Sequence, residues 1–188
     1  MMVSARNGIT RRAALAGTAT LAGLLPARKP LAAGLPDIGR LLTPVSPPTE
    51  PPDIAFSGAD GVEHRLSAFR GRGMVINFWA TWCAPCVAEM PSLAALALAL
   101  APHDIAVMPL SSDRGGAEVV ANWYRTHGVS GLPVLLDPKG NGARAFASRG
   151  IPTTVVINRQ GLLCARLEGA ADWGQEKAAA LLRRLIES

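Results

Sequence analysis

The motif Cys83-Ala84-Pro85-Cys86 limits most strongly the folds that are open to this chain. It follows a nearly unbroken apolar run, Met74–Ala80, which is typical of a strand that is buried on both faces. It also opens a stretch, Cys83–Leu100, in which Ala and Leu recur at helical spacing until Pro102. The sequence therefore predicts two cysteines at the junction of a buried strand and a helix.

Strand-like and helix-like segments alternate along the chain. The predicted strands are Ile54–Phe56, His64–Leu66, Met74–Ala80, Ile105–Leu110, Leu132–Leu136, Thr153–Ile157 and Leu162–Leu167. The predicted helices are Cys83–Leu100, Ala117–His127, Asn141–Ser148 and Trp173–Ile186, the last with Asp172 as its N-cap. This order predicts an α/β fold in which helices flank both faces of a central mixed β-sheet.

The charge of the chain is unevenly distributed. The net charge of +5 would by itself suggest a partner such as nucleic acid. Five basic residues and no acidic residue fall within residues 1–33, whereas residues 34–188 hold 14 basic and 14 acidic residues. The basicity belongs to the N-terminus, so we expect no nucleic acid as a partner.

Residues 1–33 have the features of an export signal. A polar, basic start ends at Arg11-Arg12, an uncharged run follows from Ala13 to Leu25, and the stretch Leu31-Ala32-Ala33, with its two small residues, suits cleavage. The segment from Thr10 to Leu15 resembles a twin-arginine signal; an ordinary secretory signal and an uncleaved membrane anchor are the alternatives. We therefore expect a periplasmic or otherwise exported protein, either soluble after cleavage or anchored to the inner membrane.

Residues 34–52 contain six prolines and are predicted to be an extended linker. The folded domain is expected to span residues 53–188.

The position of the cysteine pair predicts redox chemistry. The N-terminus of a helix stabilises negative charge, which lowers the pKa of a thiol there and makes Cys83 the expected nucleophile. Cys86 lies nearly one helical turn further on, where it can displace a partner from a mixed disulfide. A zinc site would need a second pair of ligands, and a static disulfide across so short a loop gains little stability.

A longer set of residues resembles the TlpA/ResA/CcmG-like family of exported thiol-disulfide oxidoreductases, within the thioredoxin superfamily. The resemblance runs from about residue 51 to the C-terminus. It is carried by Leu66–Gly71, by Asn77–Cys86 with Glu89-Met90-Pro91, and by Gly150–Thr154. It implies a thioredoxin-like fold with an N-terminal β extension and a β/α insertion between the Cys-x-x-Cys helix and a cis-proline.

The resemblance also implies roles for residues around the cysteines. Pro152 is expected to be the cis-proline that faces them, and the backbone of Ile151 is expected to pair with a bound substrate chain. Trp82, Ala84 and Pro85 are expected to complete the docking surface. Cys164 is predicted to be a small buried apolar residue rather than a third redox thiol.

A proton-transfer group is less clearly indicated by the sequence. Asn77 stands where plain thioredoxins carry a buried Asp, and an amide cannot act as a base. Glu89 lies one turn from Cys86 and is the candidate. The alternatives are a surface carboxylate or a first-turn residue that the helix dipole favours.

These features predict a thiol-disulfide oxidoreductase that needs no organic cofactor and no metal. The family suggests reduction of disulfide-bearing exported apoproteins, in cytochrome c or copper-oxidase maturation, with a membrane thiol reductant as the electron donor. A thiol oxidase or isomerase is the main alternative, and a copper-binding assembly protein is a weaker one. A peroxiredoxin-like peroxidase is excluded, because its Thr-x-x-Cys motif needs Thr where this chain has Ala80.

Overall fold

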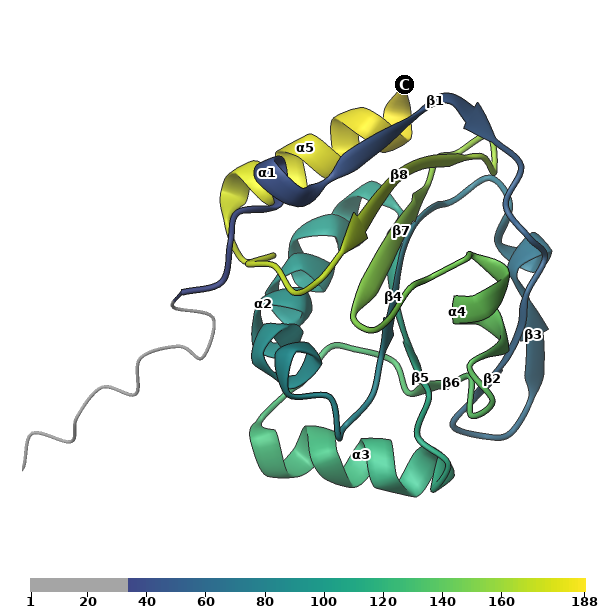
Figure 1. Ribbon diagram of the computed structural model, residues 1–188, viewed down its shortest axis with the longest axis vertical. Coiled ribbons are helices and arrows are strands. Elements are labelled where there is room, and N and C mark those ends of the chain that lie inside the picture. Colours follow the sequence, from purple (N-terminus) through teal and green to yellow (C-terminus); the bar gives the residue numbers. More distant parts are fainter. Residues whose placement is uncertain (1–33) are drawn as a thin grey trace, which may run out of the picture.

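A computed structural model describes residues 34–188, so the predicted export signal at 1–33 lies outside the described residues. An eight-stranded mixed sheet forms the centre of the fold, in the order β1-β8-β7-β4-β5-β6-β2-β3 (Figure 1). The strands are β1 (Thr43–Thr49), β2 (Ala55–Gly58), β3 (Glu63–Arg65), β4 (Gly73–Trp79), β5 (Ile105–Ser111), β6 (Leu135–Leu136), β7 (Thr153–Ile157) and β8 (Leu163–Glu168).

Seven helical segments accompany these strands. They are α1 (Ile38–Leu41), η1 (Leu66–Phe69), α2 (Ala84–Leu100), η2 (Ala101–His103), α3 (Gly116–His127), α4 (Asn141–Ala145) and α5 (Glu176–Glu187). The α/β class and the thioredoxin-like arrangement predicted from the sequence are confirmed. The segment between α2 and β7 holds α3 and β6, where the insertion was expected.

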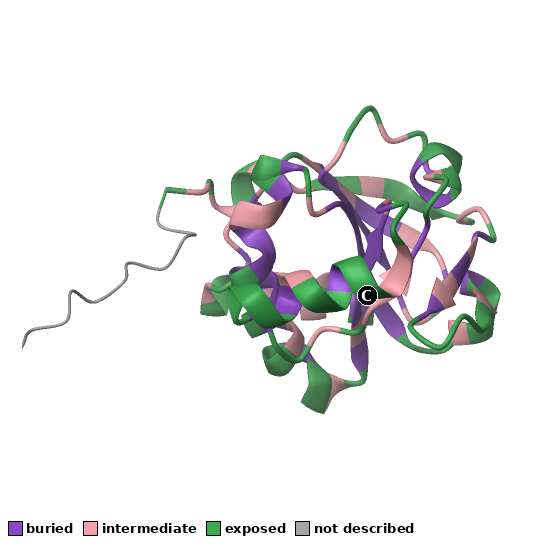
Figure 2. Cartoon of the chain, turned by 90° about the horizontal axis from the view of Figure 1, so that it is seen from below, coloured by how far each residue is buried: buried purple, intermediate pink, exposed green. Residues whose placement is uncertain are grey.

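Strand β4 is a central strand of the sheet and is buried at every position. It pairs in parallel with β5 and antiparallel with β7, which places it in the middle of the sheet. Because side chains alternate along a strand, Val75 and Trp79 enter a cluster with α2, α3 and α5, whereas Ile76 and Phe78 enter a second cluster with α4 and η1. Figure 2 shows the buried residues on these central strands and on the helix faces turned toward them.

The prediction of an extended linker at residues 34–52 is wrong for most of that segment, which contains α1 and β1. Helix α1 buries Ile38 to 1% exposure, and β1 pairs antiparallel with β8 (Figure 1). The side chain of Asp37 caps α1 and forms an ion pair with Lys177 of α5. Proline is tolerated in an edge strand, where one row of N–H groups needs no partner, so its abundance did not exclude a strand here.

Three predicted boundaries are corrected. The predicted strand Leu132–Leu136 is confined to Leu135–Leu136, and the predicted helix Asn141–Ser148 ends at Ala145. The last helix begins at Glu176 with Gln175 as its N-cap, not at Trp173. The Asp172 carboxylate instead accepts a hydrogen bond from the backbone of Gly174, which holds a turn before the helix.

Candidate active site

The two cysteines of the motif form a disulfide at the start of α2. Their Cα atoms lie 5.2 Å apart, and Cys83 is the N-cap of the helix. The Sγ atom of Cys83 accepts a hydrogen bond of 3.4 Å from the backbone N–H of Cys86. Cys83 exposes 7% of its surface and Cys86 exposes none, so a partner can reach only Cys83.

The loop before β7 faces this pair. The Ile151–Pro152 peptide bond is cis, as predicted. The carbonyl oxygen of Ile151 lies 3.6 Å from Sγ of Cys83, although the two residues are 68 positions apart in the sequence. The structure therefore brings Cys83, Ile151 and Pro152 together.

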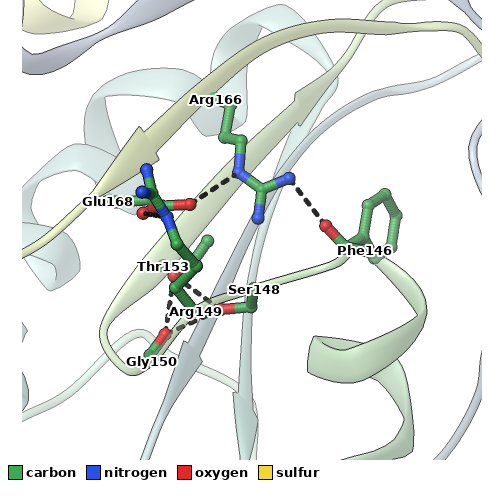
Figure 3. Close-up of polar contacts among 7 residues, drawn as sticks. All are labelled: Phe146, Ser148, Arg149, Gly150, Thr153, Arg166 and Glu168. Carbon is green, nitrogen blue, oxygen red and sulfur yellow. Dashed lines mark hydrogen bonds and ion pairs between the residues drawn. The ribbon is translucent and has the colours of Figure 1, made fainter.

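Side-chain hydrogen bonds hold this loop in place (Figure 3). The hydroxyl oxygens of Ser148 and Thr153 lie 2.6 and 2.7 Å from the carbonyl oxygen of Gly150, and 2.7 Å from each other. Arg149 forms an ion pair of 2.8 Å with Glu168 of β8. The backbone at Ile151 is thus fixed relative to the neighbouring strand.

Hydrogen bonds hold the segment between β4 and Cys83 against the end of β5. Asp113 is buried, and its carboxylate accepts hydrogen bonds from the backbone N–H of Thr81 at 2.9 Å and from the Thr81 hydroxyl at 2.7 Å. The hydroxyl of Ser111 donates a further bond of 2.7 Å to it. Beyond this anchor, Trp82 exposes 70% of its surface, and Ala84 and Pro85 are also exposed. These three predicted docking residues therefore surround the reachable cysteine.

Glu89 lies inside the protein and has no exposed surface. Its Oε1 atom accepts a hydrogen bond of 2.9 Å from the side-chain amide of Asn77. Its Oε2 atom accepts bonds from the backbone N–H of Ala171 at 2.9 Å and from the indole of Trp173 at 2.8 Å. The alternative of a surface carboxylate is wrong.

Burial raises the pKa of Glu89 to about 7, because the charged form loses its hydration. The hydrogen bonds from Ala171, Trp173 and Asn77 oppose that rise. A carboxyl group with such a pKa can accept or release a proton near neutral pH, as a general acid or base must.

The sequence reasoning missed two contributors to this region. The sequence predicts Trp173 as the first residue of the last helix, yet it lies before α5 and donates a hydrogen bond to Glu89. Asp113 was not singled out. The only local signal for it was Ser111-Ser112-Asp113 at the end of a buried strand, where polar side chains often cap a turn.

Other titratable groups lie apart from the pair. Cys164 is a free thiol buried in β8, as expected; its thiol lies 3.4 Å from the carbonyl oxygen of Val156, and burial raises its pKa to about 11.

Within residues 34–188, no three His, Cys, Asp or Glu side chains gather closely enough to hold a metal ion.

One described segment, Ala84–His103, has the length and hydropathy of a membrane span. It consists of α2 and η2, and Leu93, Leu96 and Leu100 are buried in the main core cluster. Its apolar character is that of a core helix.

Comparison with known proteins agrees with this geometry. Residues 49–166 match the AhpC/TSA family. The chain belongs to that family. Among its relatives is the thiol-disulfide oxidoreductase ResA of Geobacillus thermodenitrificans, which is 30% identical over 110 residues. The aligned part covers 58% of this chain and 62% of that relative, which is less than two thirds of its length.

Solved structures of similar fold include the exposed lipoprotein thioredoxin Etrx1 of Streptococcus pneumoniae. It is 31% identical, with a TM-score of 0.57 over 71% of this chain and 98% of that one. A secreted thiol-disulfide isomerase from Corynebacterium glutamicum has a TM-score of 0.66 over 80% of this chain and 94% of its own. At 19% identity, the second likeness concerns the fold alone.

Proposed function

We propose that this member of the AhpC/TSA family is a thiol-disulfide oxidoreductase that reduces disulfides in exported proteins. The observation that carries the proposal is the Cys83–Cys86 disulfide at the N-terminus of α2, with only Cys83 reachable and the Ile151 backbone beside it. Relatives that bear the name thiol-disulfide oxidoreductase support it.

The reaction transfers two electrons and two protons to the partner. In the reduced protein the Cys83 thiolate attacks one sulfur of a partner disulfide; a new sulfur–sulfur bond forms and the other partner sulfur leaves as a thiolate. Cys86 then loses its proton and attacks Sγ of Cys83, which releases the partner as a dithiol and closes the Cys83–Cys86 disulfide. A dithiol reductant must reopen that disulfide, and a membrane thiol reductant fits an exported protein.

Glu89 is the proposed proton-transfer residue for the second step. Cys86 is fully buried, so water does not reach its thiol freely. Glu89 lies three positions further along α2, on the same side of the helix, and its pKa of about 7 matches the pH at which the thiol must ionise. Asn77 and Trp173 are positioning residues, since they hold the carboxyl group from two directions.

The location and the substrates are also part of the proposal. The basic, apolar N-terminus and the likeness to the exposed lipoprotein thioredoxin Etrx1 support a periplasmic site of action, either soluble or membrane-anchored. Apoproteins of cytochrome c or copper-oxidase maturation are the proposed substrates, on the strength of the TlpA/ResA/CcmG-like motifs.

Trapping tests the proposal directly. A Cys86→Ser protein with Cys164→Ser added should accumulate mixed disulfides with its substrates, because the resolving thiol is gone, and a thiol reductant should release them. The matched control, Cys83→Ser with Cys164→Ser, should trap nothing. Absence of adducts from the Cys86→Ser protein would contradict a protein-disulfide activity.

The reduction potential decides between reductant and oxidant. A value near that of thioredoxin, about −270 mV, is expected for a reductant, whereas a value near about −120 mV would identify an oxidant. Equilibration of the Cys83–Cys86 pair against defined thiol buffers, followed by alkylation and mass measurement, provides that number.

A further inference from the structure

A groove beside the cysteine pair carries a concentration of positive charge. It has a volume of about 320 Å³, and its walls include Trp82 and Ile151. Four cationic side chains line it, and none of the described residues that line it is acidic: the cations are Arg114, Lys139, Arg144 and Arg149. The described chain holds equal numbers of basic and acidic residues, so this grouping is a local separation of charge.

Most of these cations are free to bind a partner. Within residues 34–188, Arg114 and Lys139 form neither an ion pair nor a side-chain hydrogen bond, and both are exposed. The guanidinium group of Arg144 donates to the neutral side chain of Asn141 at 2.6 Å. Among the residues that the structure describes, Arg149 alone of the four forms an ion pair, with Glu168, and that carboxylate also binds Arg166 (Figure 3).

Two carboxylates near the groove, those of Asp113 and Asp137, are buried and hydrogen-bonded to other groups. The carboxylate of Asp113 accepts hydrogen bonds from the backbone N–H and the hydroxyl of Thr81 and from the hydroxyl of Ser111. Asp137 is buried and accepts hydrogen bonds from the backbone N–H groups of Asn141 and Gly142, each at 2.8 Å. The exposed surface around the reachable cysteine is therefore positive, although acidic groups lie beneath it.

We propose that this groove binds an acidic, extended segment of the partner protein, next to the disulfide that Cys83 attacks. The inference rests on the proposed function and adds the charge of its substrates. The Ile151 backbone is fixed by the contacts of Ser148, Gly150 and Thr153 and offers an edge for an extended chain. The four cations come from different segments around that edge, so a run of Asp and Glu can meet several of them in turn.

The exposure of the cations indicates how they act. Exposed ion pairs contribute little affinity individually, but their summed field accelerates encounter with an oppositely charged partner. A preference for acidic partners should therefore appear in the second-order rate constant and weaken as salt rises, because the screening length falls to about 3 Å at 1 M ionic strength.

The test uses disulfide-bridged peptides of one sequence that differ only in four flanking residues, which are all Glu, all Gln or all Lys. The reduced protein is mixed with each peptide, and released peptide thiol is measured over time. The groove variant is Arg114→Gln/Lys139→Gln/Arg144→Gln. The control, Arg40→Gln/Arg125→Gln/Arg184→Gln, makes the same change in net charge at exposed positions that do not line the groove.

We expect the Glu peptide to be reduced about tenfold faster than the Lys peptide at low salt. The groove variant and 1 M salt should each abolish most of that preference, and the control should retain it. Equal rates for the three peptides, or a preference that both variants lose equally, would overturn the inference and leave the proposed function intact. Reduction of none of the peptides would overturn the function and this inference together. A groove-dependent preference for glutathione disulfide over the Glu peptide would also overturn it, by assigning the groove to a small anionic disulfide.

Discussion

The indole nitrogen of Trp173 donates a hydrogen bond of 2.8 Å to Oε2 of Glu89, between residues 84 positions apart in the sequence. This bond connects the turn before α5 to α2, which contains Cys86 and has Cys83 as its N-cap. It keeps a carboxyl group in the interior, where its pKa is about 7 because burial disfavours the charged form. Several measurable properties depend on that placement.

Replacement of Glu89 by Gln should change how stability depends on pH. The pKa of Glu89 is higher in the folded protein than in the unfolded chain, so its favourable contribution is present below about pH 4.5 and is lost as the pH rises through about 7. Relative to Glu89→Gln, the native protein should lose about 3 kcal/mol between pH 4 and pH 9. Urea unfolding of the oxidised proteins measures this difference. Glu118→Gln, at an exposed position of α3, is the control, and a pH-independent difference would contradict the assignment.

The rate of disulfide exchange should also lose a pH dependence in Glu89→Gln. If Glu89 accepts the proton of Cys86, release of a trapped partner should rise with pH through about 7 in the native protein. In Glu89→Gln that inflection should vanish and the rate at pH 7 should fall roughly 10²-fold or more, within the usual range for general bases. Stopped-flow resolution of a preformed mixed disulfide isolates this step. An unchanged inflection would assign proton transfer to another group.

A second carboxylate beside Glu89 should be tolerated only at low pH. The side-chain nitrogen of Asn77 lies 2.9 Å from Oε1 of Glu89, so Asn77→Asp would place two acids in one buried site. Such a pair shares a proton, and full ionisation is strongly disfavoured. The variant should approach native stability at pH 5 and lose roughly 2–4 kcal/mol at pH 8. Asn158→Asp is the buried control away from Glu89; an equal loss at both pH values would argue against charge repulsion.

Removal of the exposed Trp82 side chain should affect reactivity rather than stability. Trp82 is 70% exposed, so Trp82→Ala should change the free energy of unfolding by less than about 0.5 kcal/mol. If Trp82 contacts docked partners, protein-disulfide reduction should slow, and its activation free energy should rise by roughly 1–2 kcal/mol. Leu98→Ala, at an exposed apolar residue of α2, should alter neither quantity. Unchanged reduction kinetics in Trp82→Ala would remove Trp82 from the docking surface.

The N-terminal segment should contribute to stability although the sequence predicted a linker there. Ile38 is 1% exposed and packs in the main core cluster, so Ile38→Ala should cost about 2–4 kcal/mol. Val62→Ala, at a half-exposed position, should cost far less. If thermal or chemical unfolding showed no loss of stability for either Ile38→Ala or Val62→Ala, residues 34–52 would contribute nothing to the fold and would act as a linker.

The sequence was most informative where local pattern determines structure. The nearly continuous apolar run Met74–Ala80 predicted a strand buried on both faces, and Cys-x-x-Cys at the following helix start located the two cysteines that form the disulfide. The segment 150–154 located the loop that faces it. These features need only neighbouring residues for their interpretation.

Features that depend on distant partners were not predictable in the same way. Nothing local distinguishes the buried Glu89 from an exposed glutamate on α2, because its donors Asn77, Ala171 and Trp173 come from other elements. Residues 43–49 form a strand because β8 supplies their pairing partners, which lie far away in the sequence. The six prolines of residues 34–52 indicated a linker instead.

The prolines of β1 have a consequence for behaviour among unfolded chains. Thr43–Thr49 forms one outer edge of the sheet and carries Pro44, Pro47 and Pro48, which lack the N–H groups that a foreign strand would need. That edge is a poor template for intermolecular strand pairing and hence for aggregation. A protein whose proposed substrates are exported apoproteins can thus meet them repeatedly without pairing its own sheet with their strands at this edge.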